Sequence, residues 1–169
     1  MASRILKESE IEFARQVFEE QLPYGNIHLA SYFLPGNQGV PVTLASVSSL
    51  IPVRSMRHYT IYFGPEVFEQ GADRPATAST FIHELTHVWQ GFHGGLGWEY
   101  MVESMIAQGH AILTQGDRNR AYDYKPGKPW KKYNVEQQAL LVQDWFRNGM
   151  SEADERYRYI AKNIRAGQG

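Results

Sequence analysis

The sequence predicts a single α+β domain, in which a small sheet packs against several helices. Strand-like segments come first and long amphipathic segments follow, an order that is typical of this class. The chain has 169 residues, enough for one domain with a hydrophobic core, and it shows neither an internal repeat nor a low-complexity linker. We therefore expect one domain over residues 1–169, with a frayed tail at residues 166–169.

The first part of the chain predicts one helix and three strands. Residues 8–21 have helical periodicity, with an apolar face made of Ile11, Ala14, Val17 and Phe18. Pro23 then ends the helix. Strands are expected at residues 26–33 and 40–53, on either side of a turn that contains Pro and Gly. Alternation and aromatic content predict a third strand at residues 58–64.

A helix is predicted over residues 73–91. Asp73 is placed to cap its N-terminus, Pro75 suits its first turn, and Gly91 begins a glycine-rich end. Apolar residues recur at steps of four, three and four, which is the spacing of a core-facing stripe. This stripe consists of Phe81, Leu85, Val88 and Phe92.

The rest of the chain predicts three more helices. Residues 98–115 form a second long helical pattern, and residues 117–133 read as a loop. Asn134 opens a third helix, where Gln137 three residues later completes a capping box. Ser151 is expected to cap a last helix, whose apolar side contains Ile160 and Ile164.

Composition excludes several classes of function. The chain has no cysteine, so disulfides, thiolate zinc sites and a cysteine nucleophile are excluded. Its net charge of −1 gives no reason to expect nucleic acid or an anionic membrane as a partner. No apolar run reaches membrane-spanning length, and residues 1–10 lack the apolar region of a secretory signal peptide. We expect a protein that is cytoplasmic in the producing cell, with any export using another route.

An H-E-x-x-H motif at residues 83–87 is the most informative feature of the chain. Residues four apart share one face of a helix, so His83 and His87 would point the same way and could bind one Zn²⁺. Both histidines lie off the core-facing stripe, and a strand before such a helix is the arrangement expected of a zinc peptidase. Glu84 lies beside them, placed to take a proton from a water on the metal.

A catalytic zinc ion takes three protein ligands and keeps one position open, so a third ligand must come from downstream. Spacing leaves Glu103 on the second long helix and Glu136 in the first turn of the third as nearly equal candidates. His93 lies in a glycine-rich turn too close to the motif, and the longer H-E-x-x-H-x-x-G-x-x-H pattern is not met. His110 lies in mid-helix, where a packed or solvent-facing histidine is the more common role.

Three segments carry a resemblance to a known family: FIHELTHVWQ at residues 81–90, YDY at residues 122–124 and YNVEQQA at residues 133–139. They resemble the zinc metallopeptidase domains associated with bacterial type VI secretion. Such domains occur as C-terminal extensions of VgrG spike proteins, with Rhs-type toxins, or as short stand-alone proteins. They are similar, more distantly, to the metallopeptidase-like core domain of extracellular contractile injection systems.

The resemblance implies a zincin-like fold of the gluzincin type. It implies zinc bound by His83, His87 and Glu136, with Glu84 as the general base. It also implies a secreted effector or toxin that hydrolyses peptide bonds of a protein or peptide substrate. A secretion spike of the VgrG or Rhs kind and an immunity protein are the partners that such a domain would have.

Other residues have candidate roles around the metal. An oxyanion that develops near zinc needs a second donor, for which we take Tyr124, with Tyr122 and Tyr133 as alternatives. The outer nitrogens of the imidazole ligands need acceptors, and the candidates are Glu99, Asp123 and Asp144. Two other functions stay open: a zinc-bearing structural or adaptor module of a secretion apparatus, and a metal-dependent amidase that acts on cell-wall peptide.

Overall fold

The computed structural model shows an α+β protein, as the order of the sequence patterns predicts. It describes residues 1–35, 39–47, 57–94 and 123–169. The strands within these residues are β1 (Ser3–Ile5), β2 (Ile27–Ala30), β3 (Val42–Val47) and β4 (Arg57–Tyr62). Their order across the sheet is β1-β2-β4-β3, so β3 is an edge strand. β2 and β4 are parallel, whereas β1 and β3 are antiparallel to their neighbours.

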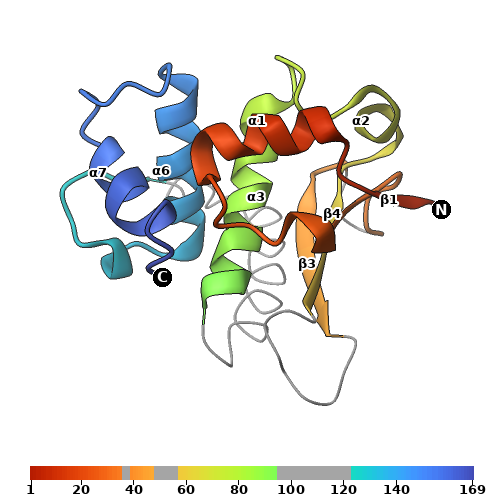
Figure 1. Ribbon diagram of the computed structural model, residues 1–169, viewed down its shortest axis with the longest axis horizontal. Coiled ribbons are helices and arrows are strands. Elements are labelled where there is room, and N and C mark those ends of the chain that lie inside the picture. Colours follow the sequence, from red (N-terminus) through yellow and green to blue (C-terminus); the bar gives the residue numbers. More distant parts are fainter. Residues whose placement is uncertain (36–38, 48–56, 95–122) are drawn as a thin grey trace.

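The helix α3 lies at the centre of the molecule. The helices α1, α2, α3, α6 and α7 span Glu8–Phe18, Pro65–Gln70, Ala78–His93, Val135–Arg147 and Tyr157–Tyr159. A π-helical turn, Ile160–Ile164, continues α7. Figure 1 shows α3 between the sheet on one side and α6 with α7 on the other, and α1 crosses one end of α3. The helix that carries the H-E-x-x-H motif therefore contacts both the sheet and the C-terminal helices.

The apolar stripe of α3 is buried, as its spacing predicts. Phe81, Leu85 and Val88 have no exposed surface, and Phe92 packs half-buried against the same core. Trp89 is also buried, and its indole N–H donates to the carbonyl of Ile164 at 3.0 Å. Burial of side chains of this size contributes about 1.5–3 kcal/mol each, so the packing fixes the rotation of α3 about its axis.

The start of α3 differs from the prediction. The helix begins at Ala78 and not at Asp73, because residues 74–77 form a turn in which the N–H of Thr77 donates to the carbonyl of Arg74. Pro75 occupies the second position of this turn, which its fixed φ favours, and a proline disfavours helical backbone in the residue before it. The proline therefore belongs to the turn before the helix and not to the helix itself.

Of the two C-terminal helices, the predicted start is confirmed for the first and wrong for the second. Asn134 caps α6 as predicted: its side chain accepts from the N–H of Gln137 at 2.8 Å, and its own N–H donates to Gln137 Oε1. Ser151 does not open a helix, because residues 151–154 form a turn and Asp154 accepts from the N–H of Arg156. Ile160 and Ile164 are nevertheless fully buried, as expected.

The shortest elements are too short to show a periodic sequence pattern, so the sequence does not predict them. β1 has three residues and α2 has six, less than two turns of a helix. The expected helix over residues 98–115 lies outside the described residues. Within the described part of the chain, no helix is long and apolar enough to cross a membrane.

A buried carboxylate joins the N-terminal elements. Glu10 has no exposed surface and accepts two hydrogen bonds from the Arg4 guanidinium, at 2.7 and 2.9 Å. It also accepts from the backbone N–H groups of Lys7 and Ala72, at 2.7 and 2.9 Å. Burial by itself raises the pKa of the Glu10 carboxyl, but these hydrogen bonds outweigh burial and hold that pKa below its usual range.

We predict that Glu10 stabilises the fold at neutral pH and that acid removes this stabilisation. Its pKa is lower in the folded chain than the usual 4.5, so the contribution is lost as the pH falls below that value. Glu10→Gln should lower the free energy of unfolding by about 2–3 kcal/mol at pH 7, as expected for a buried charged hydrogen-bond acceptor. Urea denaturation at pH 7 and pH 3.5 measures this, with Glu12→Gln on the exposed side of α1 as control. The same loss at both pH values would contradict the role of the charge.

Candidate metal centre

His83 and His87 lie on one face of α3, one turn apart. The buried stripe on the opposite side holds this face toward α6, with which α3 makes contact. The Nε2 atoms of the two imidazoles are 3.2 Å apart, and the rings meet edge to face. The i, i+4 spacing therefore brings two imidazole nitrogens to one point, as the sequence predicts.

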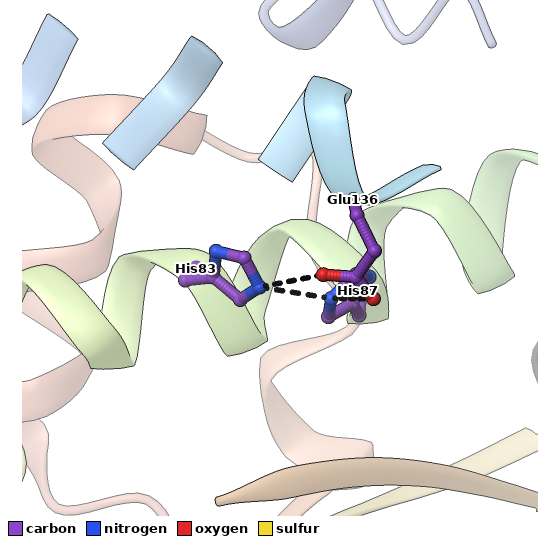
Figure 2. A group of neighbouring side chains, drawn as sticks. All are labelled: His83, His87 and Glu136. Atoms are coloured by element: carbon purple, nitrogen blue, oxygen red, sulfur yellow. Dashed lines mark hydrogen bonds and ion pairs between the residues drawn. The ribbon is translucent and has the colours of Figure 1, made fainter. Parts of the chain in front are cut away.

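Glu136 completes the cluster from the first turn of α6. Its carboxylate oxygens lie 3.3 Å from His83 Nε2 and 3.5 Å from His87 Nε2. Figure 2 shows the carboxylate reaching down from α6 to the two imidazoles on α3. Among residues 1–35, 39–47, 57–94 and 123–169, this is the one group of three side chains that could hold a metal ion together. Glu103 and His110 lie outside those residues.

The spacing of these atoms fits a zinc ion. A tetrahedral zinc about 2.0–2.1 Å from each ligand keeps its ligand atoms roughly 3.3–3.4 Å apart. The two Nε2 atoms lie 3.2 Å apart, and each has a Glu136 oxygen close to that separation, Oε2 at 3.3 Å from His83 and Oε1 at 3.5 Å from His87. Two imidazoles and one carboxylate are also a donor set that zinc prefers, so the residues fit the metal in both geometry and chemistry.

The outer nitrogens of both imidazoles contact glutamine side chains. His87 Nδ1 lies 2.8 Å from Gln90 Oε1, and His83 Nδ1 lies 3.1 Å from Gln143 Oε1. This corrects the expectation for Asp144, which accepts from Tyr124 instead, and for Asp123, which offers its backbone carbonyl to Gln137, whereas Glu99 lies outside the described residues. Amide oxygens are hydrogen-bond acceptors, so they hold the proton on Nδ1 and direct the Nε2 lone pair to the centre of the cluster.

The cluster holds positive charge at its centre. Burial alone lowers the pKa of His87, but the Glu136 carboxylate, assisted by Glu84 and Gln90, raises that pKa to about 9. Burial likewise raises the pKa of the Glu136 carboxyl, but His87 and His83 hold it well below its usual range. At neutral pH a proton on His87 therefore occupies the region in which a metal ion would lie.

Glu84 lies on the same helix but is held by the sheet. Its side chain is buried, and Oε2 accepts a hydrogen bond of 2.7 Å from the Thr43 hydroxyl on the edge strand β3. Thr43 is also buried, and it contacts the Glu84 carbonyl oxygen at 3.2 Å. No pattern in the sequence indicated Thr43, because its partner is 41 residues away.

Tyr124 and Tyr133 take part in hydrogen-bond networks beside α6. The Tyr124 hydroxyl donates to Asp144 at 2.6 Å and accepts from Arg156 at 3.1 Å. Burial, followed by the bond to Asp144, raises the pKa of Tyr124. Tyr133 donates to the carbonyl of Lys125 and so holds the loop before α6, whereas Tyr122 lies outside the described residues.

His93 has a separate role from the cluster. Its Nε2 donates to the carbonyl of Gln21 at 2.9 Å, and its ring lies 4.8 Å from that of Trp89. It therefore ties the end of α3 to the segment after α1. This agrees with the expectation that His93 does not reach back to the motif.

Comparison with known proteins identifies relatives of the whole chain. No protein-family model matches it. The chain is 32% identical over 173 residues to the type VI secretion system spike protein VgrG2b of Pseudomonas aeruginosa. This match covers 98% of the chain but only 15% of the length of that spike protein.

A solved structure shows the same relationship at the level of the fold. The effector domain of Pseudomonas aeruginosa VgrG2b superimposes with a TM-score of 0.60 and 30% sequence identity. The alignment covers 94% of this chain and 82% of that domain. Sequence and fold thus agree over most of both chains, and the protein belongs to the family of the VgrG2b effector domain.

Proposed function

We propose that this protein is a zinc-dependent metallopeptidase with a zincin-like fold of the gluzincin type, used as an effector of a type VI secretion system. The observation that carries the proposal is the convergence of His83, His87 and Glu136, where the charge of Glu84 also acts on His87. A site with two imidazoles and one carboxylate leaves a coordination position for water or substrate, which is what a hydrolase requires. The similarity to the VgrG2b effector domain supports the link to secretion.

Each residue of the motif has a distinct part in the proposed reaction. When bound, zinc would polarise the scissile carbonyl and lower the pKa of a water at the open position. His83, His87 and Glu136 would hold the metal, and Glu84 would take the proton of that water and deliver it to the leaving amine. Because Thr43 donates to Glu84 Oε2, we assign Oε1 to the proton transfer.

We also propose a class of substrate and a route of delivery. We infer a protein or peptide substrate, because the proposed chemistry breaks an amide bond. The chain matches a small part of a much longer spike protein, which supports delivery with a VgrG- or Rhs-type spike. An immunity protein in the producing cell would then protect that cell from the effector.

Zinc binding should release a proton at neutral pH. The pKa of His87 is about 9 without metal, so below that pH zinc has to displace a proton from the imidazole. Zinc affinity should therefore rise about tenfold per pH unit from pH 6.5 to 8, with about one proton released per zinc. Calorimetry in buffers of different ionisation enthalpy measures both quantities.

Two carboxylate variants provide the control for this prediction. Glu136→Gln removes a ligand and also the charge that raises the pKa of His87, so both zinc affinity and proton release should fall. Glu103→Gln should bind zinc like the wild type. Loss of zinc from Glu103→Gln alone would make Glu103 the ligand and would contradict the assignment of Glu136.

Glu84→Gln should keep zinc and the fold but lose activity. The amide preserves the shape and the hydrogen bond from Thr43 but cannot accept a proton, and positioned proton transfer contributes about 10²–10⁴-fold to the rate. Turnover of unstructured proteins and of cell-wall peptides, measured beside metal analysis, checks this, with Glu69→Gln on the exposed surface as control. Near-normal turnover by zinc-loaded Glu84→Gln would rule out the proposed base. Cleavage of cell-wall peptides alone would indicate an amidase.

Tyr124→Phe should lower kcat by about 10²-fold with little change in KM if the hydroxyl donates to the developing oxyanion, as we propose. In the structure its proton is directed at Asp144, so the hydroxyl must turn during the reaction. Steady-state kinetics and thermal unfolding of the zinc-loaded variant separate this from a purely structural role. A loss of stability with an unchanged kcat would leave Tyr124 as a tether of α6 and nothing more.

A further inference from the structure

We propose that Gln90 and Gln138 form an amide relay that fixes the tautomer of His87 and the place of Glu136, so that both glutamines are positioning residues of the metal centre. This inference rests on the proposed zinc site, which it extends beyond the three ligands. Gln90 is 3% exposed and Gln138 8% exposed. Their amide groups therefore depend on one another and on backbone for hydrogen bonds.

The relay begins at two backbone carbonyls. Gln138 Nε2 donates to the carbonyl of Trp130 at 3.1 Å and lies 3.4 Å from that of Tyr133. A carbonyl oxygen can only accept, so this end of the amide must be the NH₂ group. The Gln138 oxygen then necessarily points the other way, toward Gln90.

Gln90 connects Gln138 to His87, so the orientation of the Gln138 amide determines that of the Gln90 amide. Its Nε2 donates to Gln138 Oε1 at 2.9 Å and to the carbonyl of Val135 at 2.9 Å. Both partners are acceptors, so the amide of Gln90 cannot be reversed, and its oxygen faces His87 Nδ1 at 2.8 Å. An amide oxygen requires a donor, so in the neutral imidazole that would bind a metal the hydrogen of His87 lies on Nδ1 and the lone pair lies on Nε2.

The same side chain also locates the third ligand. The carbonyl that accepts from Gln90 belongs to Val135, the residue before Glu136 in the first turn of α6. Gln90 thus joins the helix of the two histidines to the turn that carries the carboxylate. His83 has a simpler arrangement, in which Gln143 is its one described partner at Nδ1.

Methionine variants test the relay, because methionine has nearly the length of glutamine but neither donates nor accepts strongly. Gln90→Met should weaken zinc binding about 10–100-fold, the range for loss of an outer-shell partner. Gln138→Met should weaken it about tenfold although Gln138 touches no ligand. The matched control is Gln137→Met on the same helix, which removes the side-chain acceptor of the Asn134 N–H in the capping box of α6 and should lower stability with zinc affinity within about twofold of the wild type.

The double variant distinguishes a relay from two separate effects. Gln138 reaches the centre through Gln90, so Gln90→Met with Gln138→Met should bind zinc no more weakly than Gln90→Met alone. Removing two facing polar groups together should also restore part of the stability that each single change costs. If the glutamines only stabilised the fold, the double variant would recover zinc affinity together with stability. Stability that recovers while zinc affinity stays low therefore supports the relay.

A spectroscopic signature identifies the tautomer directly. In zinc-loaded protein with ¹⁵N-labelled histidine, the wild type should show slowly exchanging Nδ1–H signals for both His83 and His87. Gln90→Met should lose the signal of His87 and keep that of His83. Unchanged zinc affinity and an unchanged His87 signal in folded Gln90→Met, beside a zinc-binding wild type, would overturn the relay alone. A wild type that does not bind zinc would overturn the proposed function and the relay with it.

Discussion

The contact between α3 and α6 is the constraint on which the centre depends. The two imidazoles share a face of α3 by their spacing alone, but the carboxylate belongs to a helix that starts 48 residues after His87. Glu136 reaches the Nε2 atoms only because the first turn of α6 packs beside the middle of α3. Any change that shifts α6 along α3 would separate the Glu136 carboxylate from the two imidazoles.

Electrostatics explain why this arrangement calls for a cation. Two imidazole lone pairs and a carboxylate directed at one point repel one another unless positive charge lies between them. A proton on His87 supplies that charge in the absence of metal. The pKa of His87 is raised because the neighbouring carboxylate stabilises this proton. A divalent ion supplies more charge at the same place and satisfies all three groups at once, which is why zinc should displace the proton.

Support around the centre comes from three directions. The buried stripe of α3 fixes the rotation of the helix, Thr43 on the edge strand holds Glu84, and the amides of Gln90 and Gln143 hold the imidazoles. Glu84 and the two imidazoles are therefore held by different elements of the fold. Chemistry that needs both a fixed metal and a free proton acceptor benefits from this separation.

The sequence predicts the positions of site residues that are close together along the chain, but it does not predict contacts between distant elements. Helical periodicity and the i, i+4 rule were sufficient to place His83 and His87 together, and the capping box correctly located the start of α6. Spacing could not choose between Glu103 and Glu136, since that choice depends on how two helices pack. The start of α3 was misjudged because Pro75 suits both a first helical turn and the turn before it.

Residues that act through distant partners were also beyond prediction from the sequence. Thr43 lies in a strand without a motif, and nothing within the YNVEQQA segment distinguishes Gln138 from its neighbours, so their roles follow only from the contacts that folding creates. The expected carboxylate partners of the imidazoles were replaced by glutamines, because the packing of α3 and α6 brings amide oxygens to the outer nitrogens.

The central claim, that His83, His87 and Glu136 bind one zinc ion, can be tested by crystallography of zinc-loaded protein with data collected on both sides of the zinc absorption edge. We expect a single anomalous peak per chain, about 2.0–2.1 Å from both Nε2 atoms and from a Glu136 oxygen, with a fourth position occupied by solvent. A peak elsewhere in the chain, a Glu103 oxygen in place of Glu136, or a fourth protein ligand that closes the site would contradict it.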